Sequence, residues 1–386
     1  MLSARSSSSL LQHRQCRAGS GGKPAAAAPC RRAGGPRRGS LQVVAYRSEL
    51  SELLLQRANR YAEVTGAAGV MTDDEVGAAL GTLLGPRGVT FLADGVVYPK
   101  DRVKDVKQLV GSLQRQHAAY EHLVYRPVVS AVNEEQGVVF TAVYYVLRNR
   151  GPVFGASEPT GRISKGFLVD KMSFDRKTGH LVSSLVTRQL TLEERDALLE
   201  DPTAWQPAVV EEGELVDVPD IVAGPNDYKY MGEVISKWAG VWSSEASLDV
   251  LPQVLAPDCR AHDGYGLANK ANGILWQVGG LGVARGPEQA REVISRTHDT
   301  YDNRNQLVSY AVSFEHKLGF HHWRANAVTK SQGEGKGGAK GQAGGERAPV
   351  EGVGLICFNK HLQIRDVYEF TMKPYKNIRP YVPKRK

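Results

Sequence analysis

The stretch that decides the fold runs Phe154-Gly-Ala-Ser-Glu-Pro-Thr-Gly-Arg-Ile-Ser-Lys-Gly-Phe167 and continues to Met172-Ser-Phe-Asp-Arg-Lys-Thr-Gly179. Proline and glycine mark a turn, and the residues after it follow the alternating apolar pattern of a β-strand over 165–174. The turn residues 175–179 then separate this strand from a second strand-like run over 181–190. Turns between such runs predict antiparallel strands.

The segments before this stretch change their hydrophobic period from 3.6 to 2. Helices are predicted from near Ser48, over 72–84 and over 101–123, the second with Thr72 and Glu75 in the capping-box pattern. Helices followed by a run of antiparallel strands indicate an α+β fold. The two strands predicted upstream of the decisive stretch cover 124–131 and 137–148.

The same order of elements restarts after residue 227. Residues 228–248 and 288–300 have helical spacing, and 254–262 occupies the place that 91–98 has in the first half. The repeated order predicts two similar cone-shaped domains, each a bent antiparallel sheet wrapped around helices. The strands predicted in the second half cover 306–318, 320–329, 352–359 and 362–371, with a Gly-rich insertion at 331–347.

The composition of the first 45 residues predicts an organelle transit peptide. Residues 1–46 hold eight Lys or Arg and no acid, and no continuous apolar segment of a secretory signal is present. Leu41-Gln-Val-Val-Ala45 is similar to processing sites of green-algal chloroplast precursors. We expect the chloroplast stroma, with a mitochondrial presequence as the alternative. The predicted boundaries are 1–45 for the transit peptide, 46–190 for domain 1, 191–227 for an acidic linker, 228–372 for domain 2 and 373–386 for a basic tail.

Charge and cysteine content exclude several classes of protein. The formal charge of +8 comes from the N-terminal segment and the tail, so a generally basic nucleic-acid-binding body is not supported. Cys259 and Cys357 are isolated, which argues against a disulfide framework or a structural zinc site. No uninterrupted apolar run reaches the length of a membrane span.

Four segments resemble the SnoaL-like polyketide cyclase family of the nuclear transport factor 2-like superfamily. In that family a P-T-G-R turn leads into a strand, as it does in 154–179 here. Phe91-Leu-Ala-Asp-Gly-Val-Val-Tyr98 resembles the hinge after the helices, and 254–262 resembles it again. The segment 356–370 resembles the closing hairpin.

The resemblance implies a strongly bent sheet that encloses a hollow, which ligands enter from its open end. The family includes cyclases, isomerases, dehydratases and epoxide hydrolases, but also non-enzymatic adaptors, so the fold does not decide the function. Acid–base chemistry in such a cone needs ionisable groups that project from strands into a dry pocket, where burial moves a carboxyl or imidazole pKa towards neutrality.

The second half holds the richer set of ionisable residues. His262, His322, Arg324 and Asp366 are a plausible acid–base set. Period-2 alternation puts His322 and Arg324 on one strand face and Asp366 with Tyr368 on one face. The alternative is that these histidines are surface or pairing residues on a half-exposed sheet.

The first half lacks an obvious catalytic set, because its last strand, around 180–187, carries no acid. Its inward candidates have alternative roles, as core aromatics or as anchors of a turn. Those candidates are Tyr98, His117, Tyr144 and Arg162. The residues predicted to line a ligand pocket in the two halves are Tyr98, Tyr144, Trp323 and Tyr368.

No cofactor is predicted. Neighbouring His321 and His322 point to opposite faces of a strand and cannot readily share one metal ion. Gly279-Gly-Leu-Gly282 lacks the strand, helix and lysine context of a phosphate-binding loop.

The C-terminal tail interleaves tyrosine with basic residues, ending in Lys384, Arg385 and Lys386, and its prolines predict an extended segment. It fits RNA, an anionic membrane surface or an acidic protein groove, with a merely solvated tail as the alternative. The expected partners of the two domains are a small apolar ligand or a plastid protein, and the two cones could form an internal pseudo-dimer.

Two functions are therefore open. The first is a non-catalytic binding or assembly module of the plastid, motivated by the repeated architecture and the basic tail. The second is a small-molecule lyase or isomerase with its acid–base chemistry in the second half. Sequence patterns favour the binding module.

Overall fold

The computed structural model describes residues 48–93, 102–153, 156–198, 205–207, 225–263, 267–269, 285–330 and 348–372. The predicted transit peptide (1–45), Tyr98, the Gly-rich insertion (331–347) and the basic tail (373–386) lie outside these residues.

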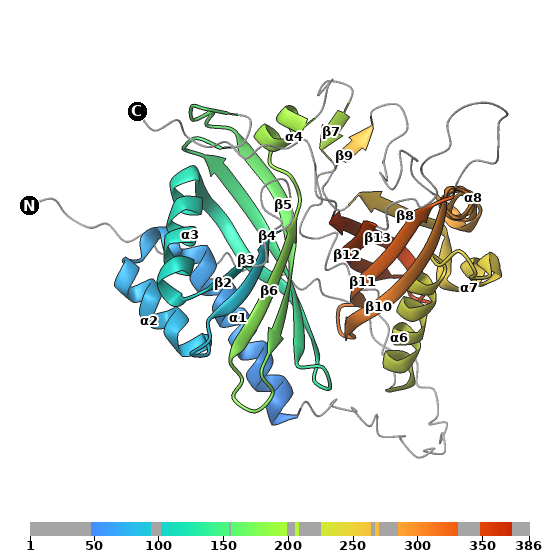
Figure 1. Ribbon diagram of the computed structural model, residues 1–386, viewed down its shortest axis with the longest axis horizontal. Coiled ribbons are helices and arrows are strands. Elements are labelled where there is room, and N and C mark those ends of the chain that lie inside the picture. Colours follow the sequence, from blue (N-terminus) through green and yellow to red (C-terminus); the bar gives the residue numbers. More distant parts are fainter. Residues whose placement is uncertain are drawn as a thin grey trace, which may run out of the picture. The chain divides into compact units, whose positions relative to one another are not determined.

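The N-terminal half consists of helices followed by a long antiparallel sheet (Figure 1). Its six strands have the order β2-β1-β6-β5-β4-β3, and every neighbouring pair is antiparallel except β1 and β6. The helices are α1 (Glu49–Ala67), α2 (Asp73–Leu83) and α3 (Val106–Ala119), with a short 3-10 helix at Ala68–Val70. The strands are β1 (Val89–Ala93), β2 (Arg102–Lys104), β3 (Tyr120–Asn133), β4 (Val138–Asn149), β5 (Ile163–Phe174) and β6 (Leu181–Arg188).

Local capping explains where the helices of this half begin. Thr72 and Glu75 form the predicted capping box at the start of α2, which confirms that pattern. The third helix is shorter than the predicted 101–123. It begins at Val106 because Asp105 caps it through the amide of Gln108, and it ends where the chain turns into strand β3. None of the described helices has the length and apolar content needed to cross a membrane.

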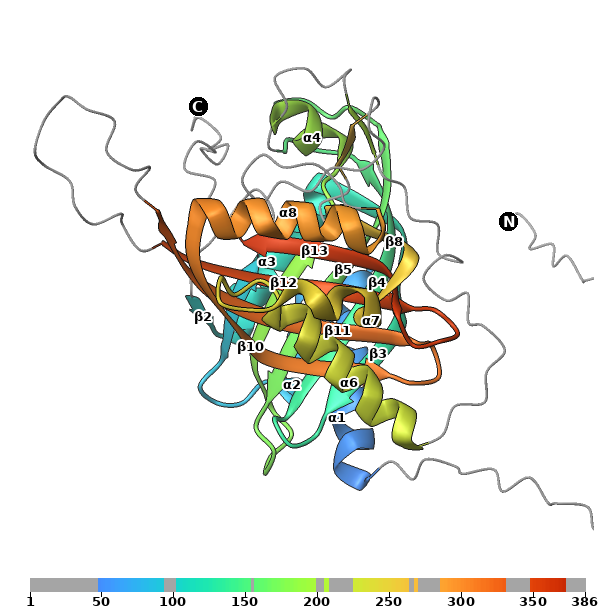
Figure 2. The same ribbon diagram turned by 90° about the vertical axis from the view of Figure 1, so that its right-hand side faces the viewer.

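The C-terminal half repeats the arrangement with five strands, in the order β10-β11-β12-β13-β8 (Figure 2). The helix predicted over 228–248 ends at Gly240, and the turn that follows it is held by the amide of Asn303, which donates to the carbonyl of Trp242 (2.9 Å). The helices are α6 (Pro225–Gly240), a 3-10 helix at Leu248–Val250, α7 (Leu251–Val254) and α8 (Gly286–Thr300). The strands are β8 (Leu255–Asp263), β10 (Tyr301–Ser313), β11 (Leu318–Thr329), β12 (Ala348–Phe358) and β13 (Ile364–Met372).

Between the halves lie a short helix, α4 (Leu192–Leu198), and a short strand, β7 (Trp205–Pro207). Strand β7 pairs antiparallel with β9 (Leu267–Asn269). The predicted linker 191–227 therefore contributes helix α4 and strand β7, which pairs with a strand of the second half.

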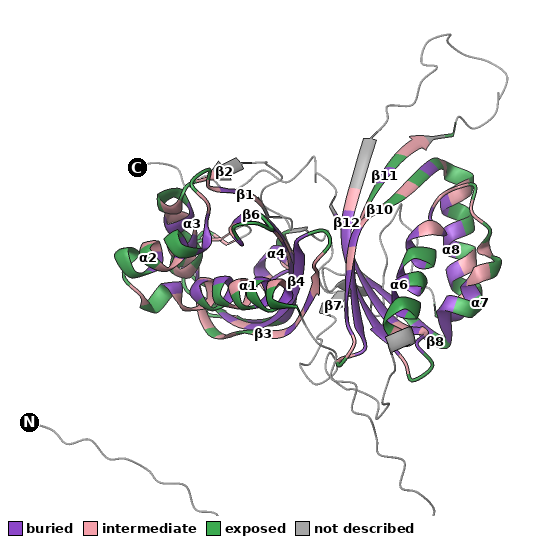
Figure 3. Cartoon of the chain, turned by 90° about the horizontal axis from the view of Figure 1, so that it is seen from below, coloured by how far each residue is buried: buried purple, intermediate pink, exposed green. Residues whose placement is uncertain are grey.

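The α+β class and the two bent sheets with helices are confirmed. In each half one face of the sheet packs against the helices, and Figure 3 shows buried residues concentrated where the strands meet them. In the N-terminal half the helices and the sheet share a core that includes Leu54, Leu80, Leu109 and Met172. In the C-terminal half Trp238 and Ile235 of α6 pack with Ile356 of β12 in the same way. Each sheet is thus closed on one side by its own helices.

The second face of each sheet is also buried, because residues 45–386 form one compact unit with an apolar cluster shared by both sheets. The rings of Phe140 and Phe320 stack at 5.7 Å between their centroids. Each is the third residue of its strand, β4 or β11, so equivalent positions meet, as across a twofold axis. Phe167 contacts Tyr368 edge to face at 5.3 Å. The sheets therefore bury apolar side chains on both faces.

We expect Phe320→Ala to lower the free energy of unfolding by about 3–5 kcal/mol, because it leaves a cavity in this layer. Urea denaturation would measure the change. Val182 is 43% exposed, so Val182→Ala serves as the control and should cost less than about 0.5 kcal/mol. A loss below about 1 kcal/mol for Phe320→Ala would show that the sheets do not depend on this contact.

Candidate functional site

A carboxyl interrupts the apolar face that the N-terminal sheet turns toward its helices. On β5, Phe167 and Val169 face the other sheet, whereas Leu168 and Asp170 point to the opposite side. Asp170 is only 6% exposed. A lone buried carboxyl is unusual unless it is paired or functional.

The hydrogen-bond donor to Asp170 is a hydroxyl group. Ser184 on β6 donates a hydrogen bond to Asp170 Oδ1 (2.9 Å). Burial raises the pKa of the Tyr61 phenol on α1, and the nearby charge of Asp170 raises it further. Hydrogen bonds to Ser184 and Thr65 lower it. Burial and Asp170 raise the pKa of Tyr125 in the same way. Both phenols therefore stay protonated and can donate.

Other polar side chains continue this centre across the sheet. Thr141 on β4 is the cross-strand partner of Asp170 and shares a hydrogen bond with Ser130 of β3 (3.0 Å). Ser130 in turn donates to Asn59 of α1 (2.9 Å). A belt of hydroxyl and carboxyl groups thus crosses neighbouring strands beneath α1.

Burial raises the pKa of Asp170 to about 7, and the hydrogen bond from Ser184 only partly offsets this effect. A carboxyl with such a pKa is protonated in about half of the molecules at neutral pH. It can therefore give or take a proton, which is the property required of a general acid or base.

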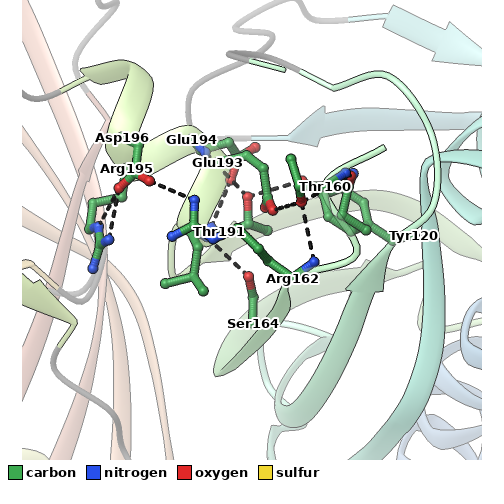
Figure 4. A network of polar contacts seen from close by, with 11 residues as sticks. Tyr120, Thr160, Arg162, Ser164, Thr191, Glu193, Glu194, Arg195 and Asp196 are labelled. Atoms are coloured by element: carbon green, nitrogen blue, oxygen red, sulfur yellow. Dashed lines mark hydrogen bonds and ion pairs between the residues drawn. The ribbon is translucent and has the colours of Figure 1, made fainter. Parts of the chain in front are cut away.

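Helix α4 and the turn before β5 form a second polar network in the N-terminal half (Figure 4). Thr160 donates to Glu193 (2.5 Å), and Arg162 pairs with Asp196 (2.6 Å). Arg188 pairs with buried Glu194, which also caps α4 through Thr191 (2.9 Å). The proline-threonine-glycine-arginine turn therefore anchors α4 to β5. This places Arg162 in a structural ion pair.

The other predicted residues of the first half have separate positions. His117 lies at the end of α3, where Nε2 donates to the carbonyl of Thr65 (2.8 Å). Its ring lies 3.9 Å from that of His122, whose pKa burial lowers to about 3. Tyr144 lies on the same face of β4 as Phe140, toward the other sheet, so it does not point toward the helices.

Within the C-terminal half, His262 and Asp366 are in direct contact. His262 Nε2 lies 3.0 Å from Asp366 Oδ1, and Arg260 and Arg365 donate to the same carboxylate (2.7 and 2.8 Å). Burial would raise the pKa of Asp366, but hydrogen bonds from His262 and Arg260 outweigh it and hold the pKa well below its usual range. Tyr368 stacks on His262 at 4.3 Å. Asp366 is thus a fully paired anion.

His322 and Arg324 form a different cluster. Both contact Glu351 of β12, at 2.5 and 3.0 Å, and Lys171 of β5 donates to His322 Nδ1 (2.6 Å). Burial lowers the pKa of His322 and lowers that of Lys171 to about 8.

The four residues predicted as one acid–base set therefore lie in two places. His322 on β11 is in register with Val353 of β12, which is in register with Phe370 of β13. Phe370 lies four residues from Asp366 along β13, so His322 and Asp366 are about 16 Å apart at ordinary strand spacing. All four lie on the face turned toward the other sheet, because they alternate with residues that face the helices. The helix-facing side instead carries Trp323, whose indole donates to Glu369 (3.0 Å).

Cys259 and Cys357 are both buried and free. Within the described ranges, no three His, Cys, Asp or Glu side chains converge in a way that would hold a metal ion.

No protein-family model and no curated protein matches this chain. Among solved structures, a candidate polyketide cyclase from Xanthomonas campestris pv. campestris is 15% identical, over 37% of this chain and 90% of its own, with a TM-score of 0.27. A candidate SnoaL-like polyketide cyclase from Jannaschia sp. CCS1 is 13% identical, over 39% and 90%, with a TM-score of 0.28. An epoxide hydrolase of M. tuberculosis is 8% identical, over 38% and 84%, with a TM-score of 0.26. Similarity at this level carries no conclusion about ligand or reaction.

The raised pKa of Asp170 predicts a pH-dependent stability. The folded state binds the proton more tightly than the unfolded state, whose pKa is near 3.8. The stabilisation is complete below about pH 4 and is lost as the pH rises through 7, on the order of 1 kcal/mol per pH unit. Asp170→Asn cannot ionise, so we expect the variant to gain stability relative to the wild type between pH 5 and pH 8.

Urea denaturation at both pH values measures this difference. Asp175→Asn is the matched control, because Asp175 is exposed and its pKa is lowered by the amides of Thr178 and Lys177, so it stays ionised over this range. Equal pH dependence in the wild type and in Asp170→Asn would show that Asp170 does not titrate there.

Proposed function

We propose that this chain is a small-molecule-binding protein of the SnoaL-like kind, and that the N-terminal half performs acid–base chemistry at Asp170. One observation carries the proposal: a buried carboxyl with a pKa of about 7, bonded to Ser184 and close to the phenol of Tyr61. Groups poised in this way at neutral pH are characteristic of catalytic sites.

The surrounding side chains define the class of ligand. Ala62, Val143 and Leu168 are among the buried apolar residues of this part of the core. Apolar surroundings of this kind favour a small, largely apolar and uncharged molecule, because a charged one would lose its hydration without compensation. The phenols of Tyr61 and Tyr125 would donate to an oxygen of the ligand, while Asp170 moves a proton at a neighbouring carbon. That pairing suits a lyase or an isomerase.

The SnoaL-like assignment of both halves rests on the sequence and on the architecture. Helices precede a run of antiparallel strands in each half, and the first strand pairs in parallel with the last, β1 with β6 and β8 with β13. The turn Pro159-Thr-Gly-Arg162 directly precedes strand β5, in keeping with the family pattern of such a turn leading into a strand.

The second candidate is a non-catalytic binding module. The saturated pairing of Asp366 with His262, Arg260 and Arg365 favours it, because these groups are committed to structure. In this case Asp170 would serve only to orient a ligand.

Mass spectrometry of small molecules retained by the purified protein would identify a ligand, and turnover of that ligand would then be measured against pH. We expect Asp170→Asn to retain the ligand and to lose turnover by about 10²–10⁴-fold. The exposed change Asp175→Asn should leave turnover intact.

The outcomes separate the two candidates. Turnover by Asp170→Asn at the wild-type rate would overturn acid–base chemistry at this residue. A retained ligand that neither protein converts would support the binding module instead.

A further inference from the structure

A lysine from one half of the chain and a histidine from the other meet between the two sheets. Phe167 and Val169 of β5 face the C-terminal sheet, so Lys171, further along the same strand, points the same way. Its Nζ lies 2.6 Å from Nδ1 of His322 on β11. Neither half alone contains this contact. It lies on the opposite side of β5 from Asp170 and does not depend on the function proposed there.

A carboxylate holds the histidine by its other ring nitrogen. His322 Nε2 lies 2.5 Å from Glu351 Oε1 on β12. The hydrogen bond from His322 lowers the pKa of Glu351 to about 2, with a further contribution from Arg324, so this carboxyl is ionised and accepts. The ring therefore keeps its proton on Nε2, and its bare Nδ1 faces the amine of Lys171. The three side chains stand in the order nucleophile, base and orienting carboxylate.

The amine of Lys171 is partly neutral near physiological pH. Burial lowers its pKa to about 8, although the charge of Glu351 opposes this effect. At pH 7.5 about a quarter of the molecules therefore carry a neutral amine, against about 0.1% for a lysine with the ordinary pKa. Burial also lowers the pKa of His322, so its ring is uncharged at this pH. A neutral amine beside a bare imidazole nitrogen is what a lysine nucleophile requires.

The cluster borders solvent, where a small molecule can approach it. Lys171 is half-buried, and the side chains of Arg324 and Glu351 are 54% and 29% exposed. Arg324 Nη2 donates to Glu351 Oε1 (3.0 Å), and the guanidinium charge also acts on Lys171. A guanidinium carries more N–H donors than this one bond uses, so Arg324 can bind a second carboxylate beside the amine.

We propose that Lys171 is a nucleophile for small aldehydes that carry a carboxylate, with His322 as its base. The neutral amine attacks the carbonyl carbon, and His322 Nδ1 takes a proton from the nitrogen and delivers it to the carbonyl oxygen. The other nitrogen proton follows the same route as the new hydroxyl leaves as water, which gives an imine. Glu351 positions the ring, and Arg324 binds the carboxylate of the aldehyde.

Reductive trapping with glyoxylate tests this proposal. The full chain would be incubated with glyoxylate and cyanoborohydride, which reduces an imine to a stable secondary amine, at pH 7.5. Peptide mass spectrometry would then follow the labelling of each lysine with time. We expect Lys171 to be labelled about tenfold faster than Lys177, which is exposed in the turn after β5. Labelling of Lys171 no faster than that of Lys177 would overturn the proposal.

Two variants test the base and the carboxylate site separately. In His322→Asn the amide oxygen can still accept from Lys171 but cannot carry a proton, so we expect labelling to slow by about 10²-fold. We expect the wild type to prefer glyoxylate over propanal, which has no carboxylate, and Arg324→Gln to lose this preference.

Wild-type labelling by a folded His322→Asn would contradict the role of the base, and an unchanged preference in Arg324→Gln would contradict the carboxylate site. The comparison of Lys171 with Lys177 in the wild type decides the question even if a variant does not fold.

Discussion

The burial of one carboxyl, that of Asp170, is the physical constraint from which the proposed acid–base chemistry follows. An acid placed among apolar side chains must either find a cation or hold its proton more tightly. Asp170 has the hydroxyl of Ser184 as its partner rather than a cation, so burial raises its pKa to about 7. The buried acids of the C-terminal half show the opposite solution, since Asp366 and Glu369 are surrounded by N–H donors and remain ionised.

The packing of the two sheets explains why buried acids such as Asp366 are paired with N–H donors, whereas Asp170 is not. Because their outer faces bury each other around Phe140 and Phe320, the buried polar groups on those faces pair with other polar side chains. The pairs His262–Asp366 and His322–Glu351 are examples. On the helix-facing side of the N-terminal sheet, Asp170 accepts a hydrogen bond from the hydroxyl of Ser184 instead.

The sequence predicted the order of helices and strands, the capping box at Thr72 and the turn at 175–179, because these depend on local pattern. It could not predict which strand face meets the helices. Alternation normally answers this, but residues 366–371 of β13 are buried on both faces, so this strand has no polar side that marks the solvent-facing direction. Alternation places Asp366 with Tyr368 on one face, but it does not say whether that face meets the helices or the other sheet. Asp170 was missed because a single acid in an apolar run resembles a solvent-facing position.

The most direct test of the central claim is the pKa of the Asp170 carboxyl, measured by ¹³C NMR of the labelled side chain across a pH titration and assigned with Asp170→Asn. We expect a value near 7 in the folded protein. A value near the ordinary 3.8 would mean that the carboxyl is solvated or paired with a cation, and the proposed acid–base centre would not exist.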